Sequence, residues 1–174
     1  MAKSTVVKTN VMGTLSGTDN TPTTPLTYAC TFDMGDFSLS GLQDGLREVV
    51  AHEAKGQFLG LSYGARVYPS FSFSAKVAQF SDSASGTLTD FVLRTTGSEY
   101  AAAVSTSGAG RPFTTTWTFV MEGTGVGDDA DHTVTLADCH LSAEFSEGDA
   151  NSLSISGVVY GAITGDLAQS EVSN

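Results

Sequence analysis

Apolar side chains recur at every second residue along most of the chain, and this alternation limits the possible folds more than any other feature. The pattern covers Tyr28–Met34, Phe71–Val77, Trp117–Met121, Ala137–Phe145 and Leu153–Val159. Successive residues of a strand point to opposite faces, so each stretch predicts a strand with one apolar and one polar face. Such strands are typical of antiparallel sheets. The alternation therefore predicts a mainly β protein, with a further strand at Thr5–Met12.

The segment after the Phe71 strand has a different period. Leu88, Phe91 and Val92 are spaced as i, i+3 and i+4, which places them on one side of a helix. Ser85 or Thr87 can cap its start and Gly97 can stop it. These signals predict one short helix at about Leu88–Thr95, covering an open face or edge of the sheets.

The long segment between Ser40 and Pro69 supports two interpretations. Leu42, Leu46, Val49 and Val50 could form a helical stripe. Alternatively, "REVVAHEA" and "QFLGLSYG" form a hairpin with its turn near Lys55-Gly56. The two glycines of the second stretch weaken the helix, so extended structure is favoured. A single domain has limited room for this segment, and part of it is expected to pack on another subunit.

Charge and cysteine content exclude several classes of protein. The net charge is −11 and the pI is about 4.3, so the surface repels phosphate backbones and anionic membranes. The start of the chain lacks the apolar stretch of a signal peptide, which predicts synthesis in the cytosol. Cys30 and Cys139 are expected to be buried thiols, with a bridge between strands as the alternative.

Two acidic stretches are candidate cation sites, and each has a simpler interpretation. "SEGDANS" separates Phe145 from Leu153 and is rich in turn formers, which predicts a hairpin loop with solvated acids. "DDADH" at Asp128–His132 lacks the ligand spacing of a calcium loop, so a solvated loop is favoured over a loose calcium site. Gly17–Pro25 and Gly123–Asp131 are also expected to be loops.

The motifs of enzymes and cofactor sites are incomplete. His52-Glu53 starts like a zinc-protease helix, but Gly56 stands where the second histidine should fall. Cys139 and His140 are expected to point to opposite faces, which argues against a zinc site with His132. The glycines of Glu122–Asp129 do not fit a nucleotide-binding fingerprint. The sequence therefore predicts no enzyme, no cofactor and no metal.

The order of these elements, rather than any single motif, suggests a family. "TYACTFDMGDFSLSGL" is followed by the arm-like segment, "PSFSFSAKVAQFSD", the short helix, "TTTWTFVMEG" and finally "FSEGDANSLSISGVVYGAI". Over roughly Gly13–Gly165 this series resembles the tail tube (major tail) proteins of long-tailed bacteriophages.

The resemblance implies a β-sandwich or half-barrel with one flanking helix, in a single domain spanning residues 1–174 with an inter-subunit arm at about 41–69. Subunits of that family form rings, typically hexameric, that stack into a hollow tube in the virion tail. The partners it implies are copies of the chain and other tail proteins at the tube ends. DNA would pass through the lumen without specific binding during ejection, and no membrane is involved. Expected inter-subunit contacts are Arg47, Val49, Val50, Phe58, Leu59 and Arg66.

Two other functions fit the same sequence, namely a capsid decoration or head-completion protein and a carbohydrate-binding β module. The cations add one expectation of their own. No Lys or Arg lies between Phe113 and Asn174, so basic partners for the acids must come from earlier in the chain, at Arg47, Arg66, Lys76, Arg94 and Arg111. Some of these are expected to form salt bridges between subunits.

Overall fold

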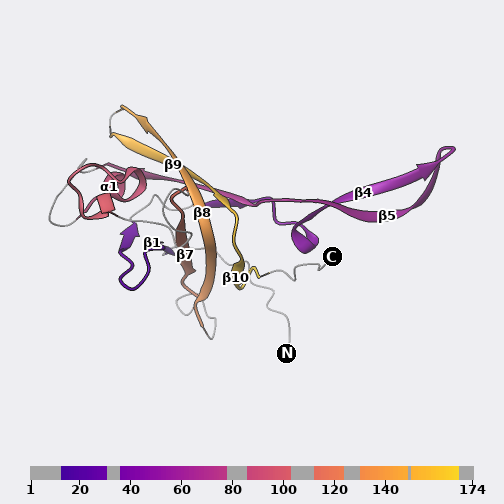
Figure 1. Ribbon diagram of the computed structural model, residues 1–174, viewed down its shortest axis with the longest axis horizontal. Coiled ribbons are helices and arrows are strands. Elements are labelled where there is room, and N and C mark those ends of the chain that lie inside the picture. Colours follow the sequence, from indigo (N-terminus) through magenta and orange to yellow (C-terminus); the bar gives the residue numbers. More distant parts are fainter. Residues whose placement is uncertain are drawn as a thin grey trace.

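The computed structural model describes residues 13–30, 36–77, 86–102, 112–123, 130–148 and 150–168. The strands are β1 (Gly13–Asp19), β2 (Thr27–Cys30), β3 (Ser38–Ser40), β4 (Arg47–Ala54), β5 (Gln57–Arg66), β6 (Ser70–Lys76), β7 (Thr115–Met121), β8 (His132–Ser146), β9 (Ser152–Val159) and β10 (Ile163–Gly165). The helical elements are α1 (Leu88–Leu93) and the 3-10 turns η1 (Asp44–Leu46) and η2 (Glu99–Ala102). The protein is mostly β, as the alternation predicts (Figure 1).

Eight of the strands form one antiparallel sheet in the order β2-β1-β7-β8-β9-β6-β3, with β10 paired beside β8. The strand β8 belongs to both halves of this sheet. Its first residues pair with β7 and β10, and its residues from Cys139 onward pair with β9.

The alternation changes phase in the middle of β8. Val134 and Leu136 are buried at even positions, whereas Cys139 is buried at an odd position. Between them Asp138 has a φ of 49°, and the register with β7 shifts by one residue. An extra residue of this kind is a β-bulge, which bends a strand and increases its twist. The assignment of Ala137 to the same face as Cys139 was wrong, because the bulge separates the two positions.

The bent sheet folds over its own apolar face. β6 and β7 are three places apart in the strand order, which in a flat sheet would separate them by about 14 Å. The ring centroids of Phe73 and Trp117 are nevertheless 5.3 Å apart, and those of Phe37 and Phe119 are 4.4 Å apart. The sheet is therefore a half-barrel with an aromatic core and is not a closed barrel.

The helix α1 closes one side of this core. Thr87 caps it through a capping box in which its hydroxyl accepts from the Asp90 N–H and the Asp90 carboxylate accepts from the Thr87 N–H. Phe91 is fully buried and meets Trp117 edge-on, with ring centroids 5.7 Å apart. The predicted helix is confirmed, but it ends at Arg94 in the left-handed conformation rather than at Gly97.

β4 and β5 form a separate two-stranded sheet that projects from the half-barrel (Figure 1). The chain reverses at Lys55 and Gly56, whose φ angles of 51° and 74° are those of a type I′ turn. The hairpin interpretation of this segment is confirmed, and its helical alternative is wrong. We call residues 47–66 the arm.

Other expectations have mixed outcomes. The loop predicted at Gly17–Pro25 was wrong at its start, because β1 runs to Asp19 and buries Leu15. The hairpin between Phe145 and Leu153 is confirmed by the pairing of β8 with β9. Cys30 and Cys139 are buried and free, so the alternative of a bridge was wrong. The strand predicted at Thr5–Met12 lies outside the described residues.

Candidate assembly surfaces

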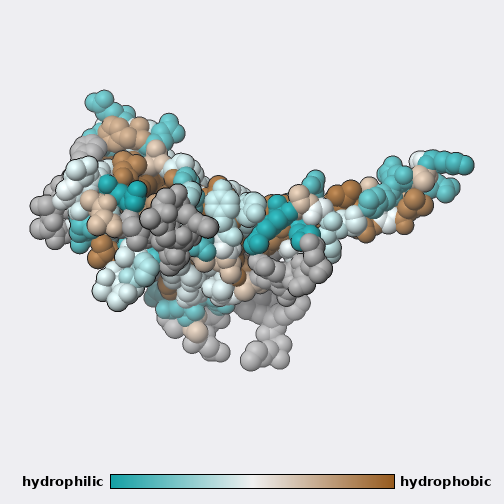
Figure 2. Space-filling view, viewed as in Figure 1, coloured by the Kyte–Doolittle hydropathy of each residue, from teal (hydrophilic) through white to brown (hydrophobic). Residues whose placement is uncertain are grey.

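The arm has one apolar face that is exposed along its length. Val49 lies opposite Tyr63 and Ala51 lies opposite Leu61, so these four side chains share a face, and Leu59 lies next to it at a register shift in β5. The exposed fractions are 53% for Val49, 67% for Leu59, 64% for Leu61 and 45% for Tyr63. Figure 2 shows hydrophobic residues distributed along this projection. Large apolar side chains at such exposure are typical of a surface that meets a partner.

The structure places all the predicted contact residues on the arm, but on different parts of it. Val49 is on the apolar face, whereas Val50 lies opposite Ser62 on the other face. Phe58 is 64% exposed near the turn, beside a register shift in β5. The sequence analysis missed Leu61 and Tyr63, although their alternation with Leu59 in "QFLGLSYG" could have identified them.

Arg47 and Arg66, the remaining predicted contacts, lie directly opposite each other at the base of the arm. Like charges in this position destabilise a strand pair. Arg47 donates to the Gly64 carbonyl oxygen at 3.5 Å, and the Arg66 guanidinium lies 5.5 Å from the ring centroid of Tyr68. The base of the arm therefore brings two arginines together, with the carboxylates of Glu48 and Asp44 close to them.

A hydrogen bond also fixes the apolar face near the base. The Tyr63 hydroxyl donates to the Asp44 carboxylate at 3.1 Å, and this bond raises the pKa of Tyr63 above its ordinary value. Tyr63 therefore keeps its proton and its donor role at neutral pH.

The outer face of the half-barrel across β3, β6, β9 and β8 is dominated by serine. Registers place Ser38, Ser72, Ser156 and Ser142 in one row across the four strands. We call this surface the serine face; its serines are Ser38, Ser40, Ser70, Ser72, Ser74, Ser142, Ser146, Ser152, Ser154 and Ser156. The opposite side of the same strands holds the core residues Phe71, Phe73 and Ile155.

An open cleft of about 530 Å³ lies on the serine face. Serines from β6, β8 and β9 line it, together with the carboxylates of Asp36 and Glu144. Its chemistry is that of a hydroxyl-rich, hydrated and weakly acidic surface. Nothing in this lining provides a nucleophile paired with a base.

The far half of the β8–β9 hairpin also has an incompletely covered apolar side. We call residues 141–157 the flap. Within the described residues, β7 pairs with β8 only as far as Cys139, so residues 141–146 are paired on one side, with β9. Phe145 points to the same side as Cys139, yet it is 48% exposed whereas Cys139 is fully buried.

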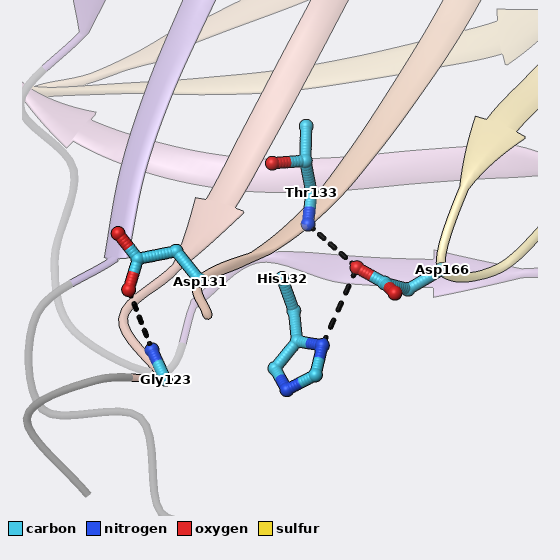
Figure 3. Close-up of polar contacts among 5 residues, drawn as sticks. All are labelled: Gly123, Asp131, His132, Thr133 and Asp166. Carbon is cyan, nitrogen blue, oxygen red and sulfur yellow. Dashed lines mark hydrogen bonds and ion pairs between the residues drawn. The ribbon is translucent and has the colours of Figure 1, made fainter. Parts of the chain in front are cut away.

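The opposite end of β8 is anchored by carboxylates. The Asp166 carboxylate accepts from the Thr133 N–H at 2.7 Å and lies 3.4 Å from His132 Nδ1, while Asp131 accepts from the Gly123 N–H at 3.0 Å (Figure 3). These contacts hold the turn after β10 to the start of β8. His132 is thus an anchoring residue here. Of the loop predicted at Asp128–His132, the structure describes residues 130–132, and His132 is already the first residue of β8 rather than part of the loop.

Among the residues that the structure describes, no group of three His, Cys, Asp or Glu side chains is placed to hold a metal ion. Cys139 is buried and His140 is exposed, so the two side chains point to opposite faces as predicted. No helix in the described ranges is both long and apolar enough to cross a membrane.

Comparison with known proteins gives one informative likeness. No family model and no curated protein matches the chain. A chain from the cryo-EM structure of an extracellular contractile injection system, "PVC sheath/tube terminator in extended state", is similar with a TM-score of 0.55 and 12% identity. The match covers 95% of this chain and 99% of that chain. At this identity the likeness establishes a shared fold over nearly the whole length of both chains.

Proposed function

We propose that this protein is a structural subunit of a tail-like tube. In this proposal residues 1–174 act as one subunit, with the arm as its inter-subunit element. Copies assemble into rings, typically hexameric, and the rings stack into a tube through which DNA is ejected. The subunit is made in the host cytoplasm, resides in the tail of the virion, meets other tail proteins at the tube ends and catalyses no reaction. Its fold is shared with a chain from a particle that contains a sheath and a tube.

The observation that carries the proposal is the arm. A two-stranded hairpin without a covering layer is marginally stable in water. Phe58, Leu59 and Leu61 are each about two-thirds exposed, and fully burying a side chain of this size contributes about 1.5–3 kcal/mol. Covering the arm would therefore contribute a favourable free energy of several times RT for each of these side chains. A second subunit is the simplest source of that cover.

The serine face supports the tube in a second way. A wall that lets DNA slide must be wetted and must not neutralise phosphates with rows of Lys or Arg. Lys76 is the one Lys or Arg that the described registers place among the serines of this face, where the carboxylate of Glu144 also lies. We assign the serine face to the lumen.

Two strand edges support closure into a ring. In the described residues, β3 pairs with β6 only over Ser70–Ser72, so residues 73–76 are paired on one side. Residues 141–146 of β8 form the corresponding edge on the other side of the β9 strand. Pairing of such edges between subunits would remove the aggregation hazard of open edges and continue the serine face around the ring.

The test is negative-stain electron microscopy of the purified protein with a double variant of the arm, Leu59→Ser with Leu61→Ser. The wild type should form rings or tubes, whereas the double variant should remain monomeric with an unchanged unfolding transition. The matched control is Leu93→Ser, which removes a leucine of similar exposure, 56%, from the end of α1 and should assemble normally.

The same preparation distinguishes the alternatives. A wild-type protein that remains monomeric at high concentration would contradict the tube. Attachment to capsids alone would support a decoration protein, and binding to a glycan array would support a carbohydrate-binding module. Charge reversal at Arg47 or Arg66 should also impair assembly, and unchanged tube length and yield would count against a role for these cations.

A further inference from the structure

The arm differs in charge from the rest of the protein. Residues 47–66 hold three cations, Arg47, Lys55 and Arg66, and two carboxylates, Glu48 and Glu53, which gives a net charge of +1. The whole chain carries −11, so the remainder carries −12. An arm that docks on another copy is therefore drawn to an acidic surface of that copy.

The flap is such a surface. Between Cys139 and Val159 the sequence holds three carboxylates, Glu144, Glu147 and Asp149, and no Lys or Arg. Glu144 and Glu147 are exposed on either side of Phe145. At physiological salt the Debye length is about 8 Å, so the negative charge of these carboxylates acts on a partner that lies against either face of the flap.

The flap also offers a matching apolar surface. Phe145 is 48% exposed, and Leu141 and Ala143, on the same side of β8, are only partly buried. The arm presents Val49, Ala51, Leu61 and Tyr63 on one side. Two sheets pack face to face about 10 Å apart when each has an apolar side, so the arm and the flap are suited to form a small sandwich.

Other exposed apolar residues are less suitable acceptors. Tyr68 and Tyr160 contact each other with ring centroids 5.0 Å apart, but Arg66 of the same arm already lies over Tyr68. Leu93 is followed by Arg94, whose guanidinium lies 4.8 Å from the ring centroid of Phe113. Each of these sites therefore carries an arginine, whereas the flap carries none.

A subunit cannot place its arm on its own flap. The arm extends away from the half-barrel on the side opposite α1. The end of β8 and the start of β9, which pair with each other, lie toward the α1 side (Figure 1). A contact between these two elements therefore joins different copies. It is head-to-tail, because each copy supplies its arm to one neighbour and its flap to another, and such contacts generate rings or filaments.

We propose that the apolar face of the arm docks on the core-side face of the flap of a neighbouring copy, guided by the carboxylates of the flap. This inference rests on the proposed function, since it names the acceptor of the arm in the assembled tube. The occupant of the flap is a second copy of this chain.

Cysteine cross-linking tests the contact. Copies with Leu61→Cys are mixed with copies with Phe145→Cys, allowed to assemble and oxidised, and disulfide-linked dimers are measured on non-reducing gels. The native Cys30 and Cys139 are buried and give a low background. The matched control replaces Phe145→Cys with Ser154→Cys, which lies in the same hairpin on the serine face.

We expect dimers from the first mixture and none above background from the control. Adding Glu147→Lys to the Phe145→Cys copies should slow cross-linking at low salt, with little effect near 1 M salt, where the Debye length is about 3 Å. Assembly seen by electron microscopy without the Leu61–Phe145 dimer would overturn the docking and leave the tube intact. Absence of any assembly would overturn both.

Discussion

The β4–β5 and β8–β9 hairpins both alternate apolar and polar residues, but the apolar side chains of β9 are buried whereas those of the arm are exposed. In β9, Leu153, Ile155 and Val159 are at most 3% exposed, because β6, β7 and α1 complete a core on that side. In the arm, Leu61 is 64% and Tyr63 is 45% exposed, although they occupy equivalent alternate positions. Alternation therefore specifies which residues share a face, but it does not specify whether a second layer covers that face.

Burial of the β9 face stabilises the isolated chain, whereas the exposed arm face adds stability only if a partner covers it. The same type of substitution should thus act on folding in the β8–β9 hairpin and, in the proposed assembly, on association in the arm.

Truncating one aliphatic side chain in each hairpin should give the clearest difference in the free energy of unfolding. Ile155→Ala should lower the free energy of unfolding by about 2–5 kcal/mol, because it leaves a cavity in the core. Leu61→Ala should change it by about 0.5 kcal/mol or less in the monomer. Urea unfolding at low protein concentration measures both, and equal losses would mean that the arm is part of the folded core.

Glycine substitution gives a second matched pair. A Cβ at Gly157 would lie 2.4 Å from Phe71 Cε1, so Gly157→Val should overpack the core and cost about 1–3 kcal/mol. A Cβ at Gly60 in β5 has nothing within 4 Å, and Gly60→Val should leave the melting temperature unchanged or slightly raised, since valine favours strands. Comparable melting temperatures for the two variants would contradict the close packing at Gly157.

The turn of the arm can be tested without disturbing the core. Gly56 has a φ of 74°, and a side chain there costs about 1–2 kcal/mol. Gly56→Ala should therefore speed amide hydrogen exchange in β4 and β5 and leave exchange in β9 unchanged. Lys55→Asn is the control, because asparagine tolerates the left-handed conformation of that residue and should not speed exchange.

The smallest signal is expected from the native thiols, which should react very slowly with alkylating reagents. Burial raises the pKa of the Cys139 thiol from 9.0 to about 12, so native protein at pH 8 should resist iodoacetamide, while an added Leu61→Cys should be alkylated rapidly. Since the folded pKa is raised, its contribution to stability is present below pH 9 and is lost as the pH rises toward 12. Mass spectrometry that shows fast modification of native Cys139 would contradict its burial.

Local patterns in the sequence predicted much of this structure. The strand β7 includes the predicted Trp117–Met121 stretch, and α1 begins after Thr87, one of the two predicted caps. The turn of the arm at Lys55-Gly56 was also predicted from the sequence. Each of these features depends on neighbours within a few residues, whose periodicity or turn chemistry is visible in the chain itself.

Other features could not be predicted because they depend on pairing between distant segments. The bulge at Asp138 was missed, since it follows from the different partners of the two halves of β8. β1 was missed in part because "GTLSGTD" has small residues, and Gly17 leaves the room that Phe91 of α1 occupies. The alternation of Leu61 and Tyr63 is visible in the sequence, but their exposure is not, since it depends on whether another layer covers that face.

The mainly β character of this protein, the turn of its arm and the faces of its regular strands follow from the amino-acid sequence, because strand geometry places alternate residues on one side. The bulge in β8, the rows of serines from four strands, the bend into a half-barrel and the uncovered arm appear only in the folded molecule. Register and coverage are set by contacts between segments far apart in the chain, and periodicity carries no information about which distant segment will be the partner.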